Sequence, residues 1–327
     1  ADLPLRRTLG KSGIAVRPLC LGGNVFGWTI DEKRSFAILD AFVDAGFDFI
    51  DTADVYSRWA SGNQGGESEQ ILGNWFAASG KRDRVVLATK VGHDLGGDRV
   101  GLSARWIRQG VEDSLKRLRT DRIDLYQSHK DDLKTPQDET LRAYEDLIKA
   151  GKVRAIGASN FSAERLRSAL DVAAAQGLPT YVALQPEYNL YARAGFEAEL
   201  QPLCEAEGIG VIPFYGLASG FLSGKYRTAA DATLSARGEG IVGKYLNPRG
   251  LAIVAAQDEV ARRLDASNAQ VAVAWLISRA TITAPIVSAT TAEQLGELLA
   301  ATRLQLDADA LATLERASAE PGSRPAG

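Results

Sequence analysis

Three segments of the sequence end in side chains that can move or stabilise a proton, and each follows a run of strand-forming residues. Residues 47–56, FDFIDTADVY, pass from aromatic and β-branched residues directly into Asp51 and Tyr56. Two further runs show the same pattern, with VVLATK ending at Lys90 and IDLYQSH ending at His129. In a barrel of parallel strands, the loops at the carboxyl ends of the strands carry the catalytic groups. The four side chains are therefore predicted to meet at one end of such a barrel.

These four residue types suit the transfer of a proton to or from a carbonyl oxygen. Hydride reduction of a carbonyl needs a proton for the oxygen, and a tyrosine with a pKa of about 10 exchanges it slowly at neutral pH. Lys90 is expected to favour the phenolate of Tyr56 and lower its pKa, each unit corresponding to about 1.4 kcal/mol. Asp51 would hold Lys90 by an ion pair. His129 would donate to the carbonyl oxygen and form an oxyanion site with Tyr56.

Each of these residues also has a purely structural explanation. Asp51 and Lys90 could form a structural ion pair, Tyr56 could be an aromatic residue at a rim, and His129 could be a hydrogen-bonded core histidine. The occurrence of all four in this order, together with the motifs below, favours chemistry. His93, the other histidine of the chain, is a candidate for a loop near the substrate.

The rest of the chain alternates between helix and strand patterns. Apolar spacing predicts helices over residues 31–45, 67–78, 103–118, 136–150, 163–176, 194–207, 251–266, 269–279 and 292–301. Strands are predicted over residues 18–21, 47–50, 85–90, 123–129, 153–159, 181–185, 210–214 and 285–288. Eight strands, each followed by a helix, favour a closed (β/α)8 TIM barrel over an open sheet. Residues 6–16 are predicted to form a β-hairpin that seals the barrel floor, and residues 215–250 a long loop after strand seven.

Length and composition fit one globular barrel domain over residues 1–327, with 45% hydrophobic and 24% charged residues. A formal net charge of −3 argues against nucleic acid or an anionic membrane as a partner. There is no apolar run of membrane-spanning length and no signal-peptide core, so a cytoplasmic location is expected. Cys20 and Cys204, the two cysteines, are predicted to be buried thiols, and no metal site is indicated. The oligomeric state is not indicated.

The motifs DTADVY, ATKVG and DLYQSH, which carry Asp51, Tyr56, Lys90 and His129, resemble the catalytic tetrad of the aldo-keto reductases. The resemblance extends from residue 9 to about residue 301 and is to the bacterial branch similar to potassium-channel β subunits. It implies an oxidoreductase that transfers a hydride between NADP(H) and an aldehyde, ketone or alcohol, with Tyr56 as general acid or base. No GxGxxG motif opens a βαβ unit, so a nicotinamide cofactor would be held by barrel loops.

The resemblance also implies residues that bind the nicotinamide half of the cofactor. Ser159 and Asn160 in GASNF, with Gln185 in LQPEYN, would hold the carboxamide, which is read by paired donors and acceptors. Gly22 would let the backbone approach the ligand closely, although a simple turn is the alternative. Residues 214–226, FYGLASGFLSGKY, resemble the segment that wraps the pyrophosphate. Its candidate contacts are Phe214, which replaces the usual stacking tyrosine, and Tyr215, Leu217, Ser219, Gly220 and Lys225.

The adenosine half would be bound by residues 286–299, IVSATTAEQLGELL. The candidate ligands there are Ser288, Thr290, Gln294, Glu297 and Leu298. Thr290 stands where many members of the family have a basic residue for the 2′-phosphate of NADP, and Leu298 replaces an asparagine commonly bonded to adenine. NADP(H) is the expected cofactor and NAD(H) is the alternative. Arg227 or Arg237 could supply the missing charge.

Trp28 and Trp59 are predicted to border an apolar, aromatic-rimmed pocket that accepts bulky carbonyl or alcohol substrates. For Trp59, packing on its own loop is the alternative. A second function also fits this family: a nicotinamide-sensing regulatory subunit of a membrane channel, with little turnover. The absence of a basic or amphipathic docking arm favours the enzyme. A phosphate-binding barrel such as an isomerase is a third hypothesis, and it predicts no nicotinamide binding.

Overall fold

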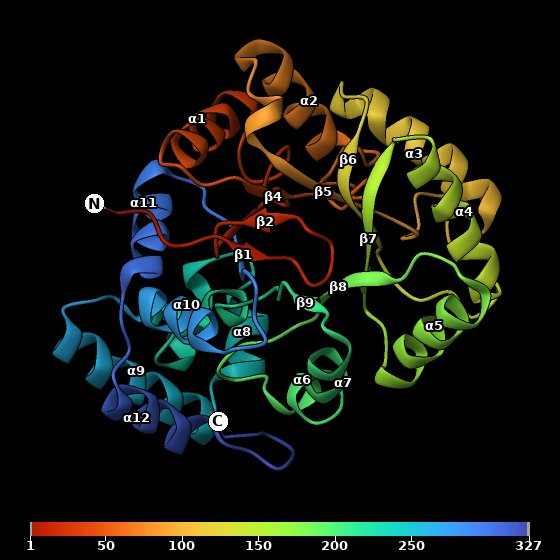
Figure 1. Cartoon of the computed structure of the whole chain (residues 1–327). Helices are drawn as coiled ribbons and strands as arrows, with labels where there is room; N and C mark the ends of the chain where they lie inside the picture. Colours follow the sequence, from red (N-terminus) through yellow and green to blue (C-terminus); the bar gives the residue numbers. More distant parts are fainter. Residues whose placement is uncertain (1, 326–327) are drawn as a thin grey trace.

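The computed structural model describes residues 2–325, and its centre is a sheet of eight parallel strands (Figure 1). The strands are β3 (Cys20–Gly22), β4 (Phe49–Asp51), β5 (Val86–Val91), β6 (Ile123–Ser128), β7 (Val153–Ser159), β8 (Tyr181–Gln185), β9 (Gly210–Val211) and β10 (Ile286–Val287). Neighbours in the sheet follow the chain order from β3 to β9, and β10 pairs with β3. The backbone N–H groups of Thr283 and Ile286 donate to the carbonyls of Val211 (2.8 Å) and Pro213 (2.9 Å). These bonds curl the sheet onto itself, which confirms the predicted (β/α)8 architecture.

Helices surround this sheet (Figure 1). They are α1 (Glu32–Asp44), α2 (Glu67–Ser79), α3 (Ala104–Leu118), α4 (Gln137–Lys149), α5 (Ala163–Gln176), α6 (Ala194–Glu197), α7 (Leu200–Glu207), α9 (Pro248–Leu264), α10 (Asn268–Ser278) and α11 (Ala292–Ala300). Several begin at a side-chain cap that satisfies a free backbone N–H group. The Ser103 and Ser162 hydroxyls accept from the third residue of α3 and α5, and Ser267 forms a capping box with Gln270.

The predicted hairpin is present as β1 (Arg7–Thr8) and β2 (Ala15–Val16), an antiparallel pair. It contributes to a small apolar cluster inside the barrel. The buried members are Leu9, Ile14, Val16, Cys20, Phe49, Ala88, Leu125, Ala155, Ala183, Ile212 and Ala284. Successive side chains of a strand point to opposite faces, so the residues two positions later share the inward face. On β4, β5 and β6 those residues are Asp51, Lys90 and Gln127, which form a polar layer above the apolar one.

Three parts of the secondary structure differ from the sequence prediction. Residues 194–207 form two helices, α6 and α7, because the backbone departs from helical geometry at Glu199. Residues 215–250 are not a plain loop but contain η2 (Ala218–Ser223), η3 (Ala229–Leu234), α8 (Gly238–Tyr245) and the start of α9. The helix α12 (Ala308–Ser318) was not predicted, although Asp307 caps it and Leu314 is buried. Two short 3-10 turns, η1 (Arg82–Arg84) and η4 (Ala301–Arg303), complete the described elements.

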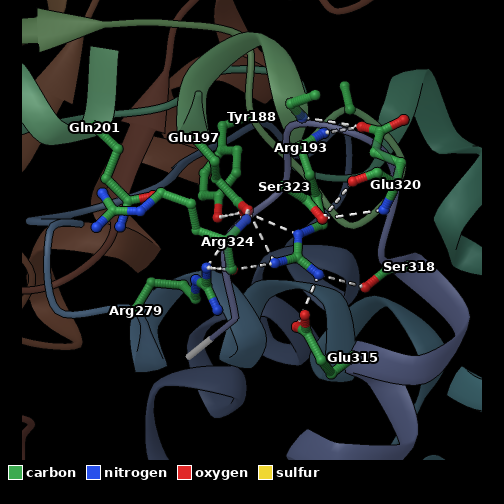
Figure 2. A network of polar contacts seen from close by, with 12 residues as sticks. Tyr188, Arg193, Glu197, Gln201, Arg279, Glu315, Ser318, Glu320, Ser323 and Arg324 are labelled. Atoms are coloured by element: carbon green, nitrogen blue, oxygen red, sulfur yellow. Dashed lines mark hydrogen bonds and ion pairs between the residues drawn. The ribbon is translucent and has the colours of Figure 1, made fainter. Parts of the chain in front are cut away.

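A buried ion network joins the segment after α12 to the start of α6 (Figure 2). Arg193 and Glu197, both fully buried, form two hydrogen bonds of 2.8 and 2.9 Å. The Arg193 guanidinium also donates to Glu315 (2.8 Å), to Ser318 (3.0 Å) and to the carbonyl of Arg324 (2.6 Å). All five of its N–H groups therefore have an acceptor. These hydrogen bonds offset the cost of removing the charges of Arg193 and Glu197 from water.

Arg193→Leu is expected to lower the free energy of unfolding by about 3–5 kcal/mol, because Glu197 would keep its buried charge without its main partner. Urea denaturation followed by circular dichroism measures the change. Arg167→Leu is the control, since Arg167 pairs with Glu207 at 2.9 Å on the surface. Such a pair contributes about 1 kcal/mol or less. Equal losses in the two variants would contradict a special role for the buried network.

Candidate active site

Lys90 is the centre of a buried polar cluster at the carboxyl ends of the strands. Its Nζ lies 2.6 Å from Asp51 Oδ2, 2.7 Å from the Tyr56 hydroxyl and 2.9 Å from the carbonyl oxygen of Thr52. Lys90 and Asp51 are fully buried, whereas Tyr56 is half-buried. β5 supplies the lysine, β4 supplies the aspartate, and the loop after β4 turns the tyrosine back towards them. Three of the four side chains singled out in the sequence are thus in direct contact.

The environment sets the protonation states of this group. Burial raises the pKa of Tyr56 to about 12, although the charge of Lys90 opposes the rise. Burial acts to lower the pKa of Lys90, but the neighbouring Asp51 carboxylate outweighs it and brings that pKa to about 12. Lys90 lowers the pKa of Tyr56, as the sequence predicts, but desolvation exceeds this effect, so the net shift is upward. At pH 7 the phenol is protonated and the lysine is charged.

His129 follows β6 and faces the same opening. Its backbone N–H donates to the carbonyl oxygen of Val91 (2.8 Å). Its ring centroid lies 6.1 Å from that of Tyr56 and 5.1 Å from that of His93. Burial, and then the charge of Lys90, lower the pKa of His129 well below its usual value of about 6.5. Its Nδ1 is buried without a hydrogen-bond partner among residues 2–325. A neutral imidazole at this place can donate one N–H bond without adding a charge.

Gln127 belongs to this site, although the sequence analysis did not single it out. Its Nε2 donates to Asp51 Oδ1 (2.8 Å), and its Oε1 accepts from Gln185 Nε2 (2.8 Å). Gln185 Nε2 also approaches Asp51 Oδ1 at 3.2 Å. Two amides thus hold the carboxylate oxygen that Lys90 does not bind. The signal was available, because Gln127 lies two residues before His129 on the inward face of a strand.

The residues expected at the carboxamide come together next to His129. Ser159 Oγ donates to the carbonyl of Gln185 (2.8 Å). Asn160, whose φ of 56° is left-handed, donates from Nδ2 to the carbonyl of His129 (2.9 Å) and approaches Ser159 Oγ at 3.4 Å. Asn160 is exposed, so its amide is open to a ligand. This arrangement offers neighbouring donors and acceptors of the kind that an amide group requires.

The segment after β9 has an unusual run of left-handed backbone conformations. Ala218, Ser219 and Gly220 have consecutive positive φ values of 50°, 59° and 99°, and Tyr215 has a φ of 57°. Non-glycine residues rarely adopt this conformation, and successive N–H groups in such turns form concavities for anions. Two of these N–H groups are already used inside the turn, since Ala218 donates to the carbonyl of Tyr215 (2.8 Å) and Gly220 donates to that of Leu217 (3.0 Å). The ring of Phe214 is half-buried, that of Tyr215 is exposed, and their centroids are 4.9 Å apart. Further along the segment, Leu217 is half-buried and Lys225 is exposed.

The predicted adenosine segment begins at β10 and enters α11. Ser288 Oγ contacts Asn24 and the carbonyl of Gly22 (3.3 Å), and a Cβ added to Gly22 would lie 2.9 Å from Ser288 Oγ and from Ile286. Close packing is thus a sufficient reason for glycine at this position.

Four further candidates lie along the start of α11. The Thr290 backbone N–H and hydroxyl both donate to Gln294 Oε1 at 2.9 Å. Glu297 accepts from the Ser267 hydroxyl at 2.5 Å. Leu298 is only 4% exposed and packs in the hydrophobic core. Thr290 and Gln294 therefore present polar groups at the surface, whereas Leu298 presents none.

Trp28 and Trp59 stand beside Tyr56 at the opening of the site. The Trp28 and Trp59 rings are 5.4 Å apart, and the Trp59 and Tyr56 rings are 5.9 Å apart, both edge to face. Both tryptophans are exposed, at 36% and 51%. Trp59 therefore contacts side chains from outside its immediate neighbourhood, which weakens the alternative that it only packs on its own loop.

Other kinds of site receive no support within residues 2–325. No group of three or more histidine, cysteine, aspartate or glutamate side chains there could hold a metal ion. None of the described helices has the length and apolar character needed to cross a membrane. Cys20 and Cys204 are buried free thiols, as predicted.

The aldo/keto reductase family model matches residues 18–319 of this chain. The chain belongs to the aldo/keto reductase family. It is similar to the uncharacterised oxidoreductase YrpG of Bacillus subtilis, with 38% identity over 321 residues that cover 96% of each chain. It is also similar to a probable voltage-gated potassium channel subunit beta of Oryza sativa, with 35% identity over 89% of each chain. Norsolorinic acid reductase of Emericella nidulans is 34% identical over 87% of this chain and 73% of that protein. The resemblance is confirmed, and with it the class of carbonyl oxidoreductases that use nicotinamide cofactors.

Proposed function

We propose that the protein reduces aldehydes or ketones with NADPH, and oxidises the corresponding alcohols with NADP⁺ in reverse, with Tyr56 as the general acid or base. The observation that carries this proposal is the 2.7 Å contact between the Tyr56 hydroxyl and Lys90 Nζ, with Asp51 2.6 Å from the same nitrogen. A structural ion pair would need no half-buried phenol at the opening of the barrel.

The bound cofactor would supply the hydride, and the side chains supply the proton and the electrostatic field. Tyr56 gives its proton to the carbonyl oxygen, and negative charge develops on the phenol beside the Lys90 ammonium. A fixed cation in a site of low dielectric stabilises this charge without reorganisation. The neutral His129 donates a second hydrogen bond to the same oxygen. Asp51 holds the ammonium in place, and Gln127 in turn holds the Asp51 carboxylate.

The pKa of Tyr56, about 12, determines which form of the phenol is present at a given pH. At pH 7 the phenol carries its proton and is ready to donate it to a carbonyl. Oxidation of an alcohol needs the phenolate, which is scarce at that pH. The proton needed for reduction is therefore available at neutral pH, and the rate of alcohol oxidation should increase as the pH rises.

Ser159, Asn160 and Gln185 would hold the nicotinamide carboxamide, and Phe214 would stack on the nicotinamide ring. Stacking needs only the ring, so the exchange of tyrosine for phenylalanine at Phe214 removes a hydroxyl contact but keeps the platform. The turn at Ser219, together with Lys225, would approach the diphosphate.

The decisive measurement is oxidation of NADPH and NADH over a panel of aldehydes and ketones. Steady NADPH oxidation that depends on the carbonyl is the expected result. A second candidate, a cofactor-sensing regulatory subunit, is favoured by the potassium-channel names of some relatives. It predicts tight NADPH binding with negligible turnover over the whole panel. Failure to bind either nicotinamide would overturn both.

Thr290→Arg tests the assignment of the adenosine segment. A guanidinium at this position can bond a 2′-phosphate bidentately, so NADPH affinity should rise relative to NADH by roughly ten- to a hundredfold. Dissociation constants at fixed ionic strength, from quenching of tryptophan fluorescence, give the ratio. Thr290→Gln adds length without charge and should leave the ratio near that of the parent. Arg227 already binds Asp258 with bonds of 2.7 and 2.9 Å. An unchanged ratio in Thr290→Arg would show that this residue does not face the ribose.

A further inference from the structure

Arg237 is an exposed cation at the opening of the site. It precedes α8, and its guanidinium carbon lies 5.6 Å from the centroid of the Trp28 ring. Among residues 2–325 it forms no ion pair and no side-chain hydrogen bond, in contrast to Arg227, which grips Asp258 through two bonds. A guanidinium that stacks on an indole keeps its N–H edge free for a planar anion.

A continuous series of rings leads from Arg237 to the proton donor. The successive separations from Arg237 to Trp28, Trp59 and Tyr56 are 5.6, 5.4 and 5.9 Å, so Arg237 lies at most about 17 Å from the Tyr56 ring. The wall between them is aromatic. An aromatic substrate that places its carbonyl at Tyr56 can therefore reach Arg237 with a group at its far end, provided that it has the right length.

Two further cations, Lys130 and Arg58, and the carboxylate of Asp94 lie near His93. The pKa of His93 is lowered by burial, by Lys130 and by Arg58, and is raised only by Asp94 and its backbone contact. The charge of Lys130 also lowers the pKa of His129. Cations such as Lys130, Arg58 and Arg237 attract a negatively charged substrate and repel a cationic one.

We propose that Arg237 recognises an anionic group on the substrate, so that the preferred substrates are aromatic carbonyl compounds with a carboxylate remote from the reacting carbonyl. This inference rests on the proposed reductase function. It assigns Arg237 to substrate selection and not to the 2′-phosphate of the cofactor, which was the alternative suggested by the sequence.

The test compares matched charged and neutral aldehydes of two lengths. These are 4-carboxybenzaldehyde and 4′-formylbiphenyl-4-carboxylate, each against its methyl ester. For the better acid, Arg237→Gln should lower the ratio of kcat/KM for acid over ester by about tenfold, mainly through KM. Arg237→Lys keeps the charge and should recover part of the ratio. Arg316→Gln removes an exposed arginine from α12 and should keep the parental ratio. The difference should shrink at high salt.

Binding measurements separate this inference from the proposed function. The alcohol products, 4-(hydroxymethyl)benzoate and its biphenyl analogue, can be titrated against tryptophan fluorescence even if no turnover occurs. Trp75, Trp106 and Trp275 are buried, so the exposed Trp28 and Trp59 should dominate quenching. Weaker product binding in Arg237→Gln, with an unchanged Kd for NADPH, supports the inference. The inference is overturned if the parent and Arg237→Gln bind the products equally well, or if the variant loses affinity for NADPH alone. Absence of turnover with every aldehyde refutes the reductase function alone.

Discussion

Tyr56→Phe is expected to lower kcat/KM for carbonyl reduction by roughly 10²–10⁴-fold, the usual contribution of a positioned proton donor. The change removes one oxygen atom and keeps the ring that contacts Trp59. The hydroxyl bonds Lys90, and Lys90 retains Asp51 and the carbonyl of Thr52 as acceptors. The fold and the affinity for NADPH should therefore stay close to those of the parent.

Tyr144→Phe is a matched control for this variant. The Tyr144 hydroxyl is also buried and lies 2.8 Å from Ser128 Oγ, but it is directed away from the Lys90 cluster. Its loss should cost about 1 kcal/mol of stability and leave turnover close to the parental rate. Steady-state kinetics with NADPH and a good aldehyde compare the two variants. If Tyr56→Phe retains a tenth of the parental activity, Tyr56 is not the proton donor.

The position of the site could be predicted from the sequence, because the ends of strands can be predicted from it. Asp51, Lys90 and His129 each stop a run of strand-forming residues, and parallel strands bring their carboxyl ends to one edge. The protonation of Tyr56 was not accessible in this way. Its pKa depends on how completely neighbouring loops exclude water, which no local pattern records.

The helices after β9 were missed for a related reason. Residues 215–250 carry many glycines and little amphipathic periodicity, so a loop was the natural interpretation. Tertiary packing stabilises a helix that the local sequence does not favour. Ile241 and Tyr245 of α8 are buried, and the Tyr245 ring stacks on Phe221. Gln127 was not predicted as a site residue, although its place on a strand was. An amide has no ionisable group that would mark it as a candidate.

Lys90→Met is expected to lower both the stability and the activity of the protein. It leaves the buried carboxylate of Asp51 with only amide donors, which should cost about 3–5 kcal/mol of unfolding free energy. It also removes the charge that stabilises the phenolate, so the alkaline rise of alcohol oxidation should move to still higher pH. Urea denaturation and pH profiles measure the two effects separately. An unchanged pH profile would make Lys90 a structural residue only.

The double variant Asp51→Asn with Lys90→Met distinguishes the structural from the chemical role of the pair. With the buried charge gone, most of the lost stability should return, since a neutral replacement of a buried ion pair is often well tolerated. Activity should not return, because no cation faces the phenol.

The pH dependence of the parental stability gives an independent check on the pair. The folded-state pKa of Lys90, about 12, lies above its unfolded value of about 10.4. The ion pair therefore stabilises the fold fully below pH ~10.4, and this contribution is lost as the pH rises through 12. The stability difference between the parent and Lys90→Met should narrow over that interval. A difference that stayed constant up to pH 12 would exclude a charged Lys90 as its cause.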